Sequence, residues 1–154
     1  MRVEKDFEEL LGLFNKHKVK YCIVGAFAVG FHGYPRYTKD MDIFVEPFLK
    51  NGQNIVRALT EFGFGSMKLT PQDFTAKGTI IQLGYEPVRV DLINSIKGCD
   101  FNQAWANKAV GKYGKYKVFF MGADELITTK KSAHRQQDRL DAALLQKRLS
   151  KIKR

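Results

Sequence analysis

The first half of the chain mixes helical and strand-like patterns of apolar residues. Between Lys5 and His17, apolar side chains recur every three or four residues and predict an amphipathic helix. Short apolar runs predict strands at 21–24 and 40–45, separated by a helical stretch of small residues. A second amphipathic pattern predicts a helix over 54–62, which Gly63 ends.

The second half begins with a predicted antiparallel hairpin around Tyr85-Glu-Pro87. In the last predicted helix, Leu140, Ala143 and Leu144 are expected to face the core. The predicted elements are strands at 78–84 and 89–93, a helix at 101–109, a basic turn at 112–117, a strand at 116–120, and helices at 123–133 and 135–149. This order predicts an α/β protein with a mixed sheet of four or five strands and helices packed against it.

The strand over 40–45 opens with the sequence Asp40-Met41-Asp42. Residues i and i+2 of a strand point to the same face, so the two carboxylates are expected to stand side by side. Two like charges held that close need a cation or a proton between them. A divalent ion with oxygen ligands, Mg²⁺ or Mn²⁺, is the simplest solution.

Two further features fit the same site. The strand before it ends at Gly25 and leads into a helical stretch, so that backbone N–H groups of Gly25 and Ala26 are free for a phosphate. Asp91 interrupts the apolar strand 89–93, where a carboxylate is costly to bury unless it is paired or bound to a metal. If this strand lies beside Asp40 and Asp42, three carboxylates converge and can hold two ions about 3.5–4 Å apart.

The order Gly25-Ala26, then Asp40-x-Asp42, then Asp91 resembles the nucleotidyltransferase superfamily related to DNA polymerase beta. The longer string from Gly33 to Asp42 is similar to small bacterial minimal nucleotidyltransferases, including those of abortive-infection toxin–antitoxin systems. The tail, with a Lys-bearing helix followed by Arg135-x-x-Asp138-x-x-Asp141, fits them too. The resemblance spans roughly residues 21–145 and implies the nucleotidyltransferase fold.

The resemblance also implies roles for individual residues. Asp40 and Asp42 would hold two Mg²⁺ ions, and Asp91 would bind the catalytic one and act on the acceptor hydroxyl. Gly25 and Ala26 would hold the β and γ phosphates through their amides, although the family often has Ser where this chain has Ala26. The remaining phosphate-binding candidates are Arg36, Thr38 and Lys130. A purely structural role explains each equally well: Arg36 would pair with an acid, Thr38 would cap the loop, and Lys130 would be a solvated side chain. Asp138 and Asp141 are expected to be structural acids that pair with Arg135 and Arg139.

Composition narrows the class of protein. The chain has 154 residues and a formal net charge of +10, which favours polyanionic partners such as RNA but also simply raises solubility. The length predicts one domain over 1–154, with helices about 123–149 packed on it. The acidic N-terminal segment and the lack of a long apolar run predict a cytoplasmic protein with no membrane contact.

The resulting hypothesis is transfer of a nucleoside monophosphate from an NTP to an RNA, protein or small-molecule acceptor, with release of pyrophosphate. The alternatives are a non-catalytic nucleotide- or RNA-binding module of the same fold, or a toxin–antitoxin component with a small helical partner protein. A glycosyltransferase with an Asp-x-Asp motif would need a larger sugar-nucleotide domain than this chain supplies.

Overall fold

The structure is a computed structural model of the chain, and it describes residues 3–34, 39–85, 88–133 and 136–152. No helix within these ranges is long and apolar enough to cross a membrane. In chain order the elements are α1 (Lys5–Lys16), β1 (Tyr21–Val24), α2 (Gly25–Phe31), β2 (Asp40–Val45), α3 (Leu49–Phe62), the 3₁₀ turns η1 (Gly65–Met67) and η2 (Pro71–Phe74), β3 (Ile80–Tyr85), β4 (Val88–Ile93), α4 (Phe101–Ala106), β5 (Ala109–Tyr113), β6 (Tyr116–Phe120), α5 (Ala123–Ser132) and α6 (Gln136–Ile152).

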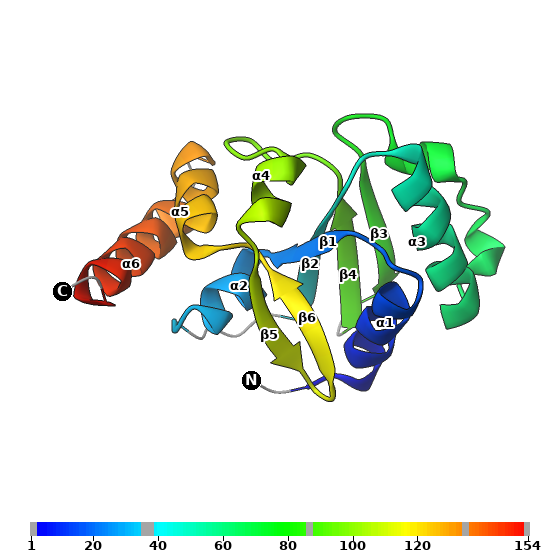
Figure 1. The fold of residues 1–154 in the computed structure, drawn as a ribbon, viewed down its shortest axis with the longest axis horizontal. Coiled ribbons are helices and arrows are strands. Elements are labelled where there is room, and N and C mark those ends of the chain that lie inside the picture. The colour runs from blue at the N-terminus through cyan, green and yellow to red at the C-terminus, as the bar shows by residue number, and fades with distance from the viewer. Residues whose placement is uncertain (1–2, 35–38, 86–87, 134–135, 153–154) are drawn as a thin grey trace.

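Six strands form one mixed sheet in the order β3-β4-β2-β1-β6-β5 (Figure 1). β2 and β4 are parallel, as are β1 and β6, and the other neighbouring strands are antiparallel. The α/β class and the hairpin of β3 and β4 are confirmed, but the count of strands exceeds the four or five expected. The additional strand is β5, whose sequence was divided between a helix end and a basic turn. As an edge strand it exposes half of Val110 and contains Gly111, so its alternation of apolar residues is weak.

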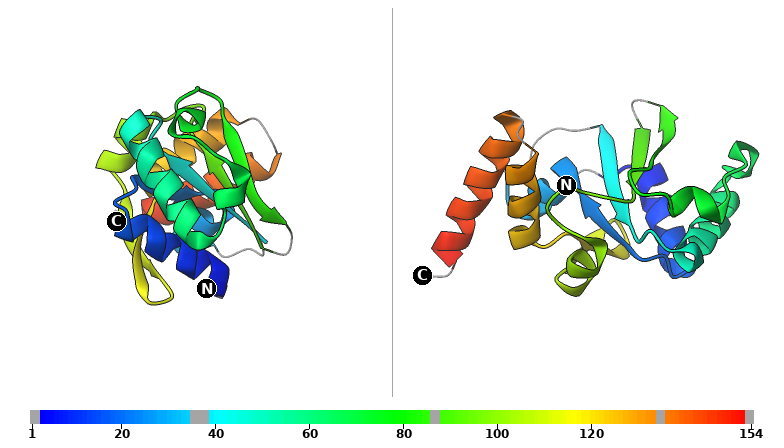
Figure 2. Two further views of the ribbon diagram at one scale, coloured as in Figure 1. Left: turned by 90° about the vertical axis from the view of Figure 1, so that its right-hand side faces the viewer. Right: turned by 90° about the horizontal axis from the view of Figure 1, so that it is seen from above.

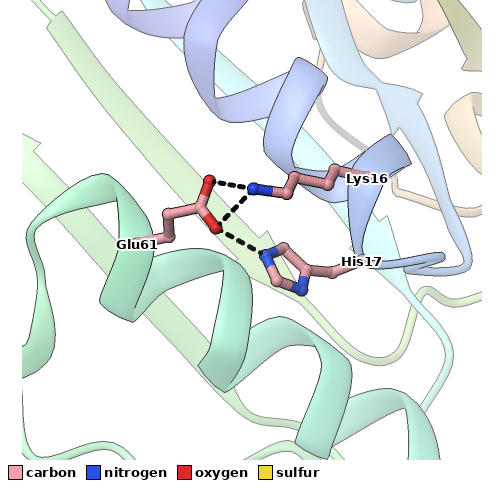
Figure 3. Close-up of polar contacts among 3 residues, drawn as sticks. All are labelled: Lys16, His17 and Glu61. Atoms are coloured by element: carbon pink, nitrogen blue, oxygen red, sulfur yellow. Dashed lines mark hydrogen bonds and ion pairs between the residues drawn. The ribbon is translucent and has the colours of Figure 1, made fainter.

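α1 and α3 lie side by side against one face of the sheet (Figure 1). The apolar stripe of α1 is buried as predicted, and its Phe14 ring lies 5.7 Å from the ring of Tyr21 on β1. At the C-terminal ends of α1 and α3, Lys16 and His17 both bind the carboxylate of Glu61, at 2.8 and 3.2 Å (Figure 3). Because Lys16 and Glu61 are exposed to solvent, the ion pair between them adds little, and the apolar stripe provides most of the stabilisation here.

α3 begins at Leu49, earlier than the pattern predicts, because a polar residue within its first turn is buried. The Asn51 amide donates to the backbone oxygens of Lys20 and Glu46, and its oxygen accepts from the Lys20 N–H. These bonds replace the apolar contacts that a sequence pattern detects. The other end is as expected, since Gly63 closes the helix with a φ of 114°.

α4 covers the opposite face of the sheet. Cys22 and Phe44 are partners in the β1–β2 register and therefore share that face. The Phe44 ring meets Phe101 edge-on at 5.2 Å, and the Cys22 thiol donates to the Ala104 carbonyl at 3.7 Å. Since Asp40 and Asp42 precede Phe44 by four and two residues on β2, they lie on this α4 face as well. The helix ends at Ala106 rather than Ala109, which already belongs to β5.

α5 and α6 pack against each other at the end of the molecule opposite to α1 and α3 (Figures 1 and 2). α5 contacts the loop before α4, where a Cβ at Gly98 would lie 2.7 Å from Ser132 Oγ. The expected core face of α6 is wrong for Leu140 and Ala143, which are exposed, whereas Leu144 is half-buried. Among the described side chains of α6, the buried apolar residues are Ala142 and Leu145. The buried face of α6 is decided by the residues of α5 against which it packs, and these include the charged side chain of Lys130.

Candidate active site

The parallel pairing of β2 with β4 brings the three predicted acids together. Asp42 is the direct partner of Asp91, and Asp40 is the direct partner of Arg89. Paired residues in neighbouring strands point to the same side, so all four side chains lie on the α4 face. The expectation that the strand of Asp91 lies beside Asp40 and Asp42 is therefore confirmed as geometry.

Arg89 stands between two of the acids. Its Nη2 atom lies 3.0 Å from Asp91 Oδ2, to which it donates a hydrogen bond, and 3.3 Å from Asp40 Oδ2. The Arg89 side chain is 28% exposed, and the Asp91 side chain is more deeply buried, with 16% of it exposed. Sequence reasoning missed this residue, although its position two before Asp91 on an alternating strand already places it on the same face.

Burial and the neighbouring carboxylates change the titration of Asp42. Its pKa is raised from 3.8 to about 6, first because of burial and then because of the negative charges of Asp91 and Asp40. The positive charges of Arg89 and Lys130 act in the opposite direction but do not cancel the rise. An added cation beside Asp42 would stabilise its charged form and lower this pKa.

The glycine turn lies directly against Asp42. Val24 is the partner of Asp42 in the β1–β2 register, and Gly25 follows it with a φ of +66°. A Cβ at Gly25 would come within 2.5 Å of Asp42 Oδ2, so the carboxylate occupies the space that a side chain would fill. Glycine is required here for the left-handed backbone and for the close approach of Asp42. Ala26, the next residue of α2, is buried.

Lys130 lies on α5, and it is buried rather than solvated. Its ammonium lies 3.0 Å from Asp138 Oδ1 and 3.3 Å from Asp141 Oδ2 on α6, and both acids are 2% exposed. The two acids stand three residues apart on one helix face, which directs both toward α5. The sequence had paired them with Arg135 and Arg139; the structure pairs both with Lys130, and Arg135 lies outside the described residues.

Two of the predicted phosphate ligands, Arg36 and Thr38, also lie outside the described residues. The structure thus brings together Gly25, Asp40, Asp42 and Asp91 and adds Arg89. Lys130 acts on this group through its charge, and the pKa of Asp42 reports that influence.

Whether these residues suit a metal ion can be tested on the side chains themselves. Within the described ranges, no three or more His, Cys, Asp or Glu side chains are arranged to hold an ion. Arg89 instead bridges Asp40 and Asp91. The chemistry of the donors is nevertheless that which a hard divalent cation takes, since three carboxylates on adjacent strands share one face and Arg89 occupies the position between two of them. In addition, Asp91 Oδ1 is buried and accepts no hydrogen bond from any described residue.

Comparisons with known proteins give different results for the sequence and for the fold. The sequence matches no protein-family profile, and a search of curated proteins finds no match. Among solved structures it is similar to a lincosamide antibiotic adenylyltransferase, LnuA, with lincomycin bound, at 15% identity and a TM-score of 0.55 over 95% of this chain and 98% of that one.

Two further solved structures show the same likeness. A protein described as a nucleotidyltransferase candidate from Thermotoga maritima has 12% identity and a TM-score of 0.56, over 97% of this chain and 96% of that one. An antigenic nucleotidyltransferase-like protein from Paracoccidioides brasiliensis has 14% identity and a TM-score of 0.55, over 93% and 77% of the two chains. At these identities the likeness concerns the backbone: the chain has the nucleotidyltransferase fold.

Proposed function

We propose that this chain is a metal-dependent nucleotidyltransferase that acts in the cytoplasm. It would move a nucleoside monophosphate from an NTP to an acceptor and release pyrophosphate. The observation that carries the proposal is the β2–β4 register, which sets Asp42 opposite Asp91 with Asp40 on the same face, beside the turn at Gly25. Clustered carboxylates next to a strand-to-helix glycine turn suit a divalent ion bound to a triphosphate.

In this proposal Asp40 and Asp42 would hold two divalent ions, Mg²⁺ or Mn²⁺, and Asp91 would be a further ligand of one of them. Ions held there would neutralise phosphate charge and lower the pKa of the acceptor hydroxyl. The acceptor oxygen forms a bond to the α-phosphorus as the α–β phosphoanhydride bond breaks, and pyrophosphate leaves. The acceptor proton would pass to Asp91 or to water.

The triphosphate would be held from two sides. Gly25 and Ala26 begin α2, so their N–H groups belong to the first turn, where a helix leaves donors without internal partners. Because Ala26 offers only its amide, the backbone has to do what a hydroxyl side chain would otherwise share. Arg36 and Thr38 are proposed to complete this side, and Lys130 to contribute positive charge from α5.

The acceptor is the open part of the proposal. One similar structure is an adenylyltransferase of a lincosamide antibiotic, which makes a small-molecule hydroxyl one class to test. The net charge of +10 favours RNA as a second class. A protein acceptor, with the chain acting in a toxin–antitoxin pair beside a small helical protein, is the third. All three use the same carboxylate chemistry, so one assay can compare them.

The assay is transfer of label from α-labelled ATP, CTP, GTP or UTP with Mg²⁺ or Mn²⁺. Total RNA, cell protein and hydroxyl-bearing antibiotics are supplied as acceptors. An Asp40→Asn, Asp42→Asn double variant removes the proposed metal ligands. An Asp6→Asn variant makes the same chemical change at an exposed position of α1 and serves as the control.

Transfer by the native protein and the Asp6→Asn control, but not by the double variant, is the expected result. Metal-dependent NTP binding without transfer to any acceptor would instead favour the non-catalytic binding module. Arg89 gives that alternative a specific basis, because a cation already bridges Asp40 and Asp91. Absence of any metal or NTP binding would overturn both readings.

A further inference from the structure

We propose that Arg89 is a built-in cation of the carboxylate site, which holds Asp40 and Asp91 until a metal ion displaces it. While Arg89 is in place, one divalent ion binds readily. A second ion, which Asp91 ligates, binds more weakly because it competes with the guanidinium. This inference rests on the proposed metal-dependent function and names the residue that sets the affinity for the second ion. Arg89 acts here through the carboxylates and is a positioning residue.

The geometry shows that Arg89 takes a position between carboxylates and does not simply lie nearby. A single nitrogen, Nη2, approaches Asp91 Oδ2 at 3.0 Å and Asp40 Oδ2 at 3.3 Å. Arg89 sits directly beside Asp40 in the parallel register and two residues before Asp91 on its own strand. Its side chain therefore reaches both acids from the strand pairing itself, without any loop having to move.

The contacts distinguish the two possible ion positions. An ion shared by Asp40 and Asp42 can leave the shorter contact, between Arg89 and Asp91, intact. An ion that Asp91 ligates meets a positive guanidinium within hydrogen-bond distance of the same carboxylate. Like charges that close repel, so Arg89 has to withdraw before this ion binds. The Arg89 side chain is 28% exposed and so already contacts solvent in part.

The charge balance of the site predicts the same order of ion binding, one ion before the other. When all are ionised, three carboxylates carry three negative charges and Arg89 offsets one of them. One divalent ion neutralises the remaining two, and a second ion then gives the site excess positive charge. Only an added polyanion, such as the triphosphate of the substrate, offsets that excess. The native protein without nucleotide is thus expected to bind one ion well and the second poorly.

Two other roles for Arg89 make different predictions. If it only strengthens the pairing of β2 with β4, its removal lowers the melting temperature and leaves metal binding unchanged. If it only binds a substrate phosphate, its removal weakens NTP binding and again leaves metal binding unchanged. Metal affinity is therefore the measurement that separates the three roles, and it needs no catalytic activity.

The experiment is a titration of the full chain with Mn²⁺, with free Mn²⁺ followed by electron paramagnetic resonance. The native protein is compared with Arg89→Met, which keeps much of the aliphatic chain and removes the charge. Arg57→Met is the matched control, because Arg57 lies on α3, where it donates to Asn54 at an exposed position. Arg89→Lys tests whether a point charge can replace the guanidinium. Circular dichroism melts establish that each variant is folded, and Arg89→Gln replaces Arg89→Met if the latter does not fold.

We expect one tight and one weak Mn²⁺ site in the native protein and in Arg57→Met. In Arg89→Met the second site should tighten by about tenfold or more, because a charge at this distance has at least that effect. Arg89→Lys should fall between them. Two equally tight sites in the native protein, or an unchanged second site in Arg89→Met, would overturn the role of Arg89 and leave the proposed function standing. No Mn²⁺ binding by any of the proteins would overturn the proposed metal-dependent function itself.

Discussion

Asp42 on β2 and Asp91 on β4 are direct partners in a parallel pair of strands, on a face of the sheet that α4 covers further along. Parallel pairing sets two carboxylates of different strands side by side without any turn between them. Burial, and after it the negative charge of Asp91, raises the pKa of Asp42 to about 6. The predictions below follow from this pair and from the groups around it.

The metal-free protein should lose stability as the pH rises through the pKa of Asp42. The folded-state pKa, about 6, lies above the ordinary value of 3.8, so the folded state prefers the protonated acid. The stability that protonated Asp42 contributes is therefore lost as the pH rises from about 4 to 6. Asp42→Asn should remove this part of the pH dependence and raise the free energy of unfolding at pH 7 by about 3 kcal/mol. Urea unfolding in EDTA from pH 4 to 8 measures it, and an identical profile for both proteins would contradict it.

Gly25→Ala should disrupt the site more than the same change at another left-handed glycine. At Gly25 a Cβ meets Asp42 Oδ2, whereas at Gly63, with a φ of +114°, nothing lies within 4 Å. Both changes introduce backbone strain of about 1–3 kcal/mol, but only the first displaces a carboxylate. Mn²⁺ binding and label transfer should fall in Gly25→Ala and persist in Gly63→Ala. Equal effects of the two changes on binding would show that strain alone is responsible.

Lys130→Met should destabilise the protein strongly, apart from any effect on transfer. The change leaves Asp138 and Asp141 buried without the ammonium that lies 3.0 and 3.3 Å from them. Removal of one partner of a buried ion pair typically costs about 3–5 kcal/mol. Urea unfolding at pH 7 measures the loss. Adding Asp138→Asn and Asp141→Asn to the same protein should restore much of it, and the lack of any restoration would show that the charges are not the cause.

Asp91→Asn should separate catalysis from nucleotide binding. The amide keeps the shape of the side chain but is a poorer metal ligand and cannot accept the acceptor proton. Transfer should fall by about a hundredfold or more, while NTP binding, assigned to Gly25, Ala26 and the other phosphate ligands, should change little. Comparing label transfer with equilibrium NTP binding tests this. Parallel loss of both would place Asp91 among the groups that hold the substrate.

Much of the local structure could be predicted because it depends on neighbouring residues alone. The stripe of α1, the strand Tyr21–Val24, the strand opening at Asp40 and the hairpin before Ile93 all follow from spacing. The alternation of β2 and β4 also indicated which acids share a face. Where a polar residue replaces an apolar one, as Asn51 does in α3, or where an edge strand is exposed, as β5 is, the pattern is incomplete and the limits were missed.

By itself the sequence determined most of the elements, the two-residue spacing of Asp40 and Asp42 and the glycine before them, because strand alternation and turn geometry act within a few residues. Only the tertiary structure decided which strands are neighbours, and hence that Arg89 lies between Asp40 and Asp91. It also decided that Lys130 is buried against Asp138 and Asp141 rather than solvated. The physical reason is that ion pairs between elements depend on the register of strands and the packing of helices, which contacts distant in sequence determine.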